Sequence, residues 1–207
     1  MHRGCKRSLK FVFRATGTIV ALAGLLGGCD SKASAQAAPT ATRNVDLSVF
    51  AGLSGNYTGI AGGRNLDLTA GADIGFRPLF SFYPSIEGRG EYPLDGGAVD
   101  RQENVLGGLK LARHYGRLLP YGDVLAGRGA ISYQKFRFPT ADPAFYYVRS
   151  VSNVFSVGGG VDFALTSHWL FKLDAQFQRY SSPVTASGHA VSKPLTAGLT
   201  YRFTFGR

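Results

Sequence analysis

The chain has 207 residues, a formal net charge of +10 and two cysteines, which leaves room for one domain and a leader segment. Residues 1–37 hold six of the basic side chains and one acid, so the remaining charge is too mild to favour a nucleic-acid partner. Glycine (28), phenylalanine (15) and tyrosine (10) are abundant, which argues against a helical protein because glycine is unfavourable inside helices.

The first 37 residues have the pattern of a cleaved export signal. A basic start is followed by the apolar run 15–28, which is too short to span a bilayer as a helix. Two cleavage sites are open. A small-x-small pattern gives a signal peptide of residues 1–37, and a lipobox-like sequence gives residues 1–28 with a lipidated Cys29. Residues 38–44 read as a short linker before the folded domain, 45–207.

From residue 45 onward, apolar and polar residues alternate in successive segments, which is the pattern of strands with one apolar face. Most segments are long enough for a tilted crossing of an outer membrane. The connections between them alternate strictly between long and short, as in barrels with short periplasmic turns and long external loops. The expected strands are 45–53, 66–76, 80–92, 104–114, 119–129, 153–163, 169–179 and 194–205.

The charges agree with this pattern. Each acid after residue 44 falls on the polar face of a strand or in a long connection, as expected if the apolar face meets hydrocarbon. Three basic residues fall on the apolar face near strand ends, where long side chains reach the interface: Arg113, Arg128 and Arg179. We expect the last two to lie at the outer leaflet, where they either face lipopolysaccharide phosphates or are interfacial arginines with no particular partner. The weakest strands are the fourth and fifth, because the polar face there carries Leu106, Leu119 and Leu125.

The last expected strand alternates without interruption and ends in aromatic residues, Tyr201, Phe203 and Phe205. With the segments 158–163 and 167–170, it resembles the OmpA-like family of small outer-membrane β-barrels. The resemblance implies an all-β, eight-stranded antiparallel up-and-down transmembrane barrel, a monomer in the outer membrane of a Gram-negative bacterium. It also implies that the barrel assembly machinery reads the terminal aromatics. An even number of strands places both termini in the periplasm.

Eight strands enclose an interior about wide enough for side chains alone. We therefore expect the polar residues of the lumen face to fill the barrel as a network of ion pairs. A narrow pore for ions or small solutes is the alternative, and it would favour cations because acids are in excess. The residues expected in this network are Glu87, Arg89, Glu91, Lys110, Asp123, Asp162, Lys172, Asp174 and Arg202.

The expected function is structural or surface-interacting, without catalysis. A lipid A-modifying enzyme is the second alternative, because some eight-stranded outer-membrane barrels have that activity. Ser187 and His189 would share one face of an extended segment, yet the chain has no match to the deacylase or palmitoyltransferase motifs. The histidines are dispersed, so neither a metal site nor a cofactor is expected.

The longest connection is the candidate interaction surface. Residues 131–150 read as a hairpin with a proline-bounded turn, in which aromatic and basic residues are interleaved. They could bind an external polyanion, sugar or protein, or they could stiffen the hairpin by cross-strand pairing. The candidate binding residues are Tyr133, Lys135, Arg137, Phe145, Tyr147 and Arg149. The other expected partners are outer-membrane lipid and lipopolysaccharide.

Overall fold

The computed structural model describes residues 46–95, 97–134, 138–142 and 144–203. The secondary-structure elements of this part of the chain are eight β-strands. It contains no helix that is long and apolar enough to cross a membrane. The strands are β1 (Asp46–Tyr57), β2 (Arg64–Gly75), β3 (Phe82–Asp95), β4 (Asp100–Arg113), β5 (Leu118–Tyr133), β6 (Arg149–Ala164), β7 (Trp169–Ser181) and β8 (His189–Phe203).

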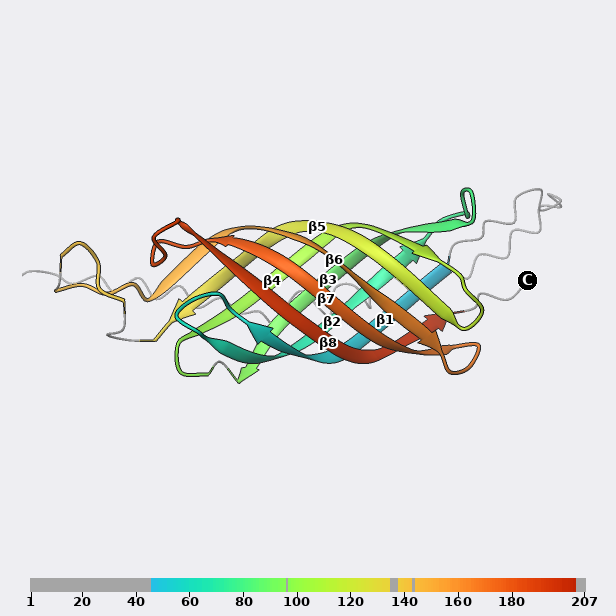
Figure 1. Cartoon of the computed structure of the whole chain (residues 1–207), viewed down its shortest axis with the longest axis horizontal. Coiled ribbons are helices and arrows are strands. Elements are labelled where there is room, and N and C mark those ends of the chain that lie inside the picture. The colour runs from blue at the N-terminus through green and yellow to red at the C-terminus, as the bar shows by residue number, and fades with distance from the viewer. Residues whose placement is uncertain (1–45, 96, 135–137, 143, 204–207) are drawn as a thin grey trace, which may run out of the picture. The chain divides into compact units, whose positions relative to one another are not determined.

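Each strand pairs antiparallel with the next, and β1 also pairs with β8, so the sheet closes into a barrel (Figure 1). The predicted eight-stranded up-and-down transmembrane barrel is confirmed. At one end β1 begins and β8 ends; we call it the turn end, and its connections are 76–81, 114–117 and 165–168. The opposite end is the hairpin end, with connections 58–63, 96–99, 134–148 and 182–188.

The strands are strongly staggered. Following the pairing register from Tyr201 once round the barrel returns to β8 at Val191, ten positions earlier. In an eight-stranded barrel such a stagger goes with strands tilted by roughly 35–45° from the axis. The successive partners are Val49, Ala72, Gly88, Gly107, Ala126, Phe155 and Arg179.

The two faces of the sheet have opposite character. Along β7, burial alternates at every residue, with Lys172 1% exposed and Leu173 43% exposed. Buried polar side chains line the interior, whereas large apolar side chains cover the exterior. A soluble barrel would have the reverse arrangement, so hydrocarbon is the solvent that suits this exterior.

Closure of the barrel depends on two glycines. Gly52 of β1 and Gly198 of β8 pair across the closing seam. A Cβ added at Gly198 would contact the carbonyl oxygen of Ala51 and would lie 2.7 Å from the Cα of Gly52. A Cβ at Gly52 would meet the equivalent backbone atoms of β8, so the two strands approach each other more closely than side chains allow.

The predicted strict alternation of long and short connections is wrong for the first half of the chain. The connections 58–63 and 76–81 have the same length, and so do 96–99 and 114–117. The strands continue past the apolar band at the hairpin end, and β5 and β6 reach 16 residues each. The apolar pattern stops at the edge of that band, whereas the hydrogen-bonded ladder continues beyond it.

Two acids expected in a long connection belong to β4. Asp100 is the first residue of this strand, and its buried carboxylate accepts a hydrogen bond from Thr58 Oγ1 at 2.7 Å. Glu103 lies on the outward face and forms an ion pair with Arg149. The prediction that no acid occupies the outward face is therefore wrong at the hairpin end, where β4 extends beyond the apolar band.

The start of the third strand is also displaced from its expected position. Residue 80 was expected to begin this strand, but Phe80 and Ser81 have φ angles of 49° and 69°. Such left-handed backbone cannot continue a strand. Phe80 therefore belongs to the turn 76–81, and β3 begins at Phe82.

We predict that Gly198→Val lowers the yield of folded barrel, because a branched side chain forces the β1–β8 seam apart. Overpacking of this kind costs about 1–3 kcal/mol. The yield is measured as the heat-modifiable band on a gel after refolding into detergent. Gly55→Ala is the matched control, since a Cβ at Gly55 has no atom within 4 Å. Equal folded yields for the two variants would contradict the seam argument.

Candidate functional site: the barrel lumen

Arg89 is the centre of the lumen network. The alternation of β3 turns Glu87, Arg89 and Glu91 inward, and all three are buried. Arg89 Nη2 lies 2.6 Å from Glu87 Oε1, and Nη1 lies 2.6 Å from Asp174 Oδ1. Asp123 is 3.7 Å away. One guanidinium therefore holds carboxylates from β3, β5 and β7.

Two lysines form the adjoining part of the network, towards the turn end. Lys110 Nζ lies 3.2 Å from Asp73 Oδ2 and 3.7 Å from both Glu87 and Asp162. Lys172 Nζ lies 3.7 Å from Asp162. The ring of Tyr121 faces both ammonium groups, at 4.1 Å from Lys110 Nζ and 4.2 Å from Lys172 Nζ. The ring stabilises two neighbouring cations that would otherwise repel each other.

Tyr121 is able to occupy this position because its partner on the neighbouring strand β6 is a glycine, Gly160. Its hydroxyl donates a hydrogen bond to Asp174 Oδ2 at 2.8 Å. A Cβ added at Gly160 of β6 would lie 2.7 Å from the same hydroxyl. The glycine run 158–160 is thus explained by close packing, because both the neighbouring strands and side chains such as Tyr121 approach it.

A layer of amides separates the ion pairs from the hairpin end. Gln178 Nε2 donates to both oxygens of Glu91, at 2.8 and 2.9 Å, and Asn104 Nδ2 donates to Glu91 Oε2 at 2.8 Å. Tyr180 Oη accepts from Asn104 at 2.7 Å. Glu91 was predicted to join the ion pairs, but its hydrogen-bond donors are neutral amides.

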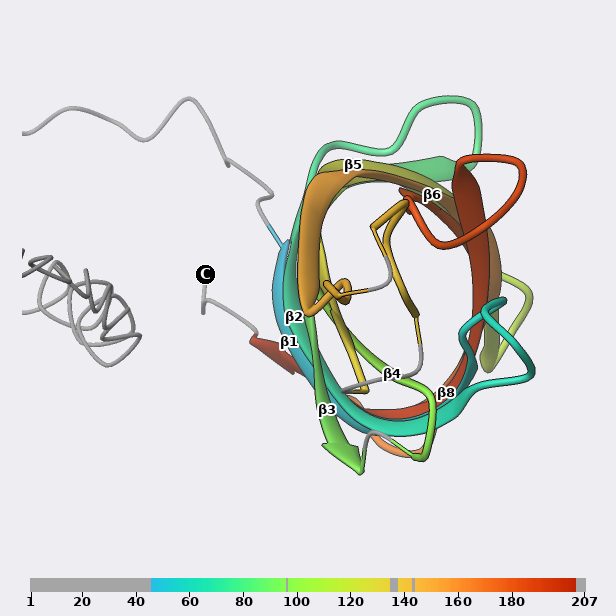
Figure 2. The same cartoon turned by 90° about the vertical axis from the view of Figure 1, so that its left-hand side faces the viewer.

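An apolar cluster closes the hairpin end above this layer. Leu125 is 1% exposed and Tyr180 is 0% exposed, and Phe138 and Tyr147 of the 134–148 connection pack against the cluster. Figure 2 shows this connection lying within the outline of the strand ring. The cluster explains why two leucines of the weak strands face inward. Its buried members are Ile60, Val99, Leu106, Leu125, Ile131, Tyr133, Val154, Tyr180 and Ala190.

The turn end of the lumen is open. A cavity of about 110 Å³ extends from Asp46 at the rim to Lys110 and Asp162 in the network. Arg202 and His114 also line it. Partial burial lowers the pKa of His114 below its ordinary value, and the positive charge of Arg202 adds to this effect. Arg202 places a positively charged side chain at this mouth.

The structure brings together most of the predicted network, and two residues differ from it in addition to Glu91. Asp73 was not included in the predicted network, although it is the nearest carboxylate to Lys110. Arg202 was included, yet it lines the mouth and takes part in none of the ion pairs formed among the described residues. The sequence shows which side chains of a strand face inward. Their position along the barrel axis, however, depends on the stagger between neighbouring strands.

The predicted surface residues are divided between the interior and the exterior. Tyr133 was expected to be a surface residue, but it is 5% exposed and its hydroxyl lies 2.9 Å from those of Ser150 and Ser182. Its strand continues further than expected, which draws the ring into the apolar cluster. Phe145 is 63% exposed, Tyr147 is half-buried and Arg149 is exposed. Lys135 and Arg137 lie outside the described residues.

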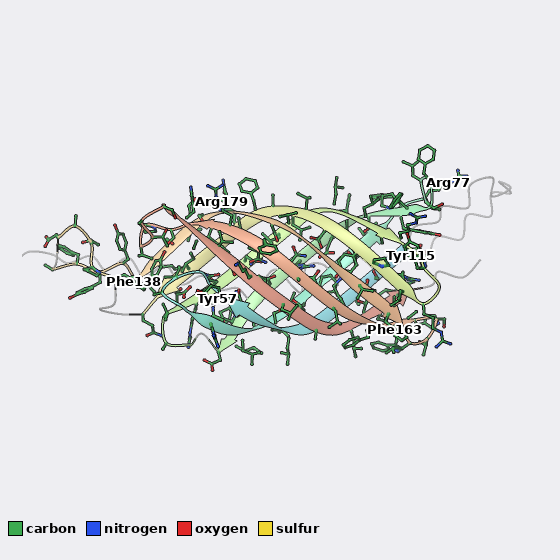
Figure 3. All side chains as sticks on the ribbon, in the orientation of Figure 1. Tyr57, Arg77, Tyr115, Phe138, Phe163 and Arg179 are labelled. Carbon is green, nitrogen blue, oxygen red and sulfur yellow. The ribbon has the colours of Figure 1, made fainter. Side chains whose placement is uncertain are left out.

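The aromatic residues of β8 form a cluster at the turn end. The ring of Tyr201 lies 5.0 Å from that of Trp169 and 5.0 Å from that of Phe203, both edge to face. Tyr115 and Phe163 lie at the same end, opposite Tyr57 and Arg179 (Figure 3). Phe205 and Cys29, the other predicted assembly and lipidation residues, lie outside the described residues.

The residues considered for catalysis or metal binding are engaged with the backbone or with rings. Ser187 Oγ donates to the backbone carbonyl of His189 at 3.1 Å. His168 stacks on Tyr201 at 5.8 Å, and His114 meets Tyr83 edge to face at 4.4 Å. Among the residues that the structure describes, no group of three or more His, Cys, Asp or Glu side chains is arranged to hold a metal ion.

Comparison with known proteins supports the fold. No protein-family model matches the chain. No curated protein matches it in sequence. The barrel is similar to the crystal structure of Neisserial surface protein A, with a TM-score of 0.50 and 11% identity over 77% of this chain and 97% of that one.

Two further solved structures have lower scores. Ail, the attachment invasion locus protein of Yersinia pestis, is 14% identical with a TM-score of 0.46, over 77% of this chain and 99% of that one. The outer membrane enzyme PagL is 13% identical with a TM-score of 0.40, over 77% and 99%. At these identities the similarity concerns the fold alone. The fold is that of the small eight-stranded outer-membrane β-barrels.

We predict that Arg89→Gln destabilises the barrel by about 3–5 kcal/mol, because it removes the cation from the buried Asp123 and Asp174 and the nearer of two cations from Glu87. The measurement is the free energy of unfolding in urea, with the barrel folded into lipid vesicles. Arg89→Lys, which keeps the charge, should lose less. Arg179→Gln on the outward face is the matched control and should change stability by no more than about 0.5 kcal/mol. A loss for Arg89→Gln as small as that of the control would show that the network contributes little.

Proposed function

We propose that this protein is a non-enzymatic outer-membrane barrel with a closed lumen and a structural or surface-interaction role. The observation that carries the proposal is the filling of the interior. Ion pairs around Arg89 occupy the middle of the barrel, and the apolar cluster covers them at the hairpin end. Because the interior of such a barrel is filled, interactions with other molecules take place on its outer surface and at its connections.

The hairpin end is proposed to face outside the cell. The outward face near this end carries several basic side chains, among them Arg128 on β5, Arg179 on β7 and Lys193 on β8. Lys193 Nζ lies 5.8 Å from the ring centre of Phe177, at the edge of the apolar band. Cations at that level suit the phosphates of lipopolysaccharide in the outer leaflet. Both ends of the chain then face the periplasm.

The 134–148 connection is proposed as the surface that meets an extracellular partner. It is a short hairpin, in which Tyr147 N donates to Phe138 O at 2.9 Å and Thr140 N donates to Phe145 O at 3.0 Å. Phe138 and Tyr147 anchor it on the apolar cluster, while Phe145 and Val148 are 63% and 59% exposed. An anchored hairpin that presents apolar side chains loses little conformational freedom when a partner binds.

At the other end, Tyr201 and Phe203, followed by Phe205, are proposed as the signal that the barrel assembly machinery reads. The support is their place in the closing strand. β8 completes the barrel by pairing with β1, and the rings of Tyr201 and Phe203 pack against each other at the edge where β8 ends.

We predict that Phe145→Cys reacts with a membrane-impermeant maleimide in intact cells. Tyr115→Cys, in the 114–117 connection, should react only after the outer membrane is permeabilised. The unsubstituted chain is the control for background labelling of its own cysteines. Labelling of Tyr115→Cys but not of Phe145→Cys in intact cells would reverse the proposed orientation.

A closed lumen should not conduct. We predict that the purified protein gives no conductance steps in a planar bilayer, with a general porin recorded under the same conditions as the positive control. Replacing Leu125 and Ile131 with serine should raise the leak, because polar side chains admit water to the apolar cluster. Discrete steps from the unsubstituted protein would instead favour the narrow pore.

A further inference from the structure

A groove runs along the outside of the barrel from the rim of the turn end towards the middle of the apolar band. Its volume is about 640 Å³, and it lies over β4, β5 and β6. Leu111, Val124 and Val157 form its apolar walls, and each of them is 48–65% exposed. Gly122 of β5 also lines the groove and faces outward. It pairs with Leu111 of β4 on one side and with Gly159 of β6 on the other. The lining is mostly apolar, as expected of a site that a hydrocarbon chain fills.

Among the described residues that line the groove, one is a cation, Arg113 at the rim. The guanidinium carbon of Arg113 lies 5.4 Å from the ring centre of Phe82 and 5.0 Å from that of Tyr115. Two aromatic rings therefore hold the side chain at the mouth of the groove. Arg113 is exposed and belongs to none of the ion pairs formed between described residues. Its hydrogen-bond donors are available to an anion that lies in the membrane interface.

We propose that this groove binds an anionic phospholipid, with one acyl chain over Gly122 and the phosphate at Arg113. Arg113, the one cation among the described residues that line the groove, matches a single phosphate, whereas several outward cations, Arg128, Arg179 and Lys193 among them, lie near the hairpin end. The site lies on the lipid-facing surface and involves neither the lumen network nor the 134–148 connection. It is therefore independent of the closed lumen and of the orientation proposed above.

A substitution at Gly122 tests the proposal, because it fills the groove without disturbing the fold of the barrel. A Cβ added at Gly122 would lie 3.7 Å from its nearest neighbour, the carbonyl oxygen of Gly158, which is an ordinary contact. Gly122→Leu should therefore fold while its side chain fills the groove. Gly55, which also faces outward and has no atom within 4 Å of an added Cβ, provides Gly55→Leu as the matched control. Leu111→Trp narrows the same groove from β4 if Gly122→Leu folds poorly.

The experiment is native mass spectrometry of the purified, detergent-folded chain titrated with phosphatidylglycerol or with phosphatidylcholine. We expect the unsubstituted protein to prefer phosphatidylglycerol. Arg113→Gln should weaken phosphatidylglycerol binding roughly fivefold and remove the preference. Gly122→Leu and Leu111→Trp should reduce the binding of both lipids, because they displace the acyl chain. Gly55→Leu should bind both lipids as the unsubstituted protein does.

Two outcomes would overturn the proposal. One is an Arg113→Gln variant that keeps the preference for phosphatidylglycerol. The other is a pair of groove-filling variants that bind lipid no differently from Gly55→Leu. Because the assay uses the isolated barrel, either outcome leaves the maleimide labelling and the conductance results unaffected, so the lipid site and the proposed function fail separately.

Discussion

The narrow interior of eight staggered strands is the constraint on which the rest of the structure depends. Neighbouring strands reach a given height with different residues, so the side chains that meet in the lumen come from alternate strands. Arg89 of β3 meets Asp123 of β5 and Asp174 of β7, and its guanidinium lies 5.6 Å from the ring centre of Phe50 of β1. Lys110 of β4 meets acids of β2 and β6 in the same way. Two cations thus connect strands that the backbone ladder does not pair.

The charges of the lumen are distributed so that each ionised group has several partners. Burying a charge is costly unless it is paired and hydrogen-bonded, and removing one partner of a buried pair is more costly still. The five acids of the ion-paired region outnumber its three cations, and neutral groups meet part of the difference: Gln176 donates to Asp123 at 2.9 Å and Tyr121 donates to Asp174. Aromatic rings likewise stabilise the lysines, with Lys172 Nζ 4.6 Å from the ring centre of Phe50. A defect at any one of these groups therefore affects side chains from several strands.

The sequence was sufficient to predict the strand count, the inward and outward faces and most of the lumen residues, because each depends on a period of two that can be read locally. The sequence was insufficient to predict where along the barrel axis each side chain lies, and therefore which inward side chains meet. Arg202 faces the lumen as predicted, but the stagger places it at the mouth, away from Arg89. Tyr133 and Asp100 were assigned to connections because the apolar alternation ends before them, although the strands do not. Nothing local in the sequence indicates that Tyr133, Val154 and Tyr180 converge, since they lie on β5, β6 and β7.

The two ends of the barrel differ in a way that follows from their interiors. At the hairpin end an apolar cluster lies inside the barrel, so the connection above it is anchored on packed side chains such as Phe138 and Tyr147. At the turn end the lumen opens into a cavity lined by charged side chains such as Asp46 and Arg202 together with the buried Leu119 and Leu170, and no described residue of the connections there packs against the apolar cluster. Their aromatic and basic side chains, such as Tyr115 and Arg113, are directed to the exterior instead, where they contact each other at the edge of the apolar band. The same difference in the lumen therefore leaves a structured hairpin at one end and a lipid-facing groove with a fixed cation at the other.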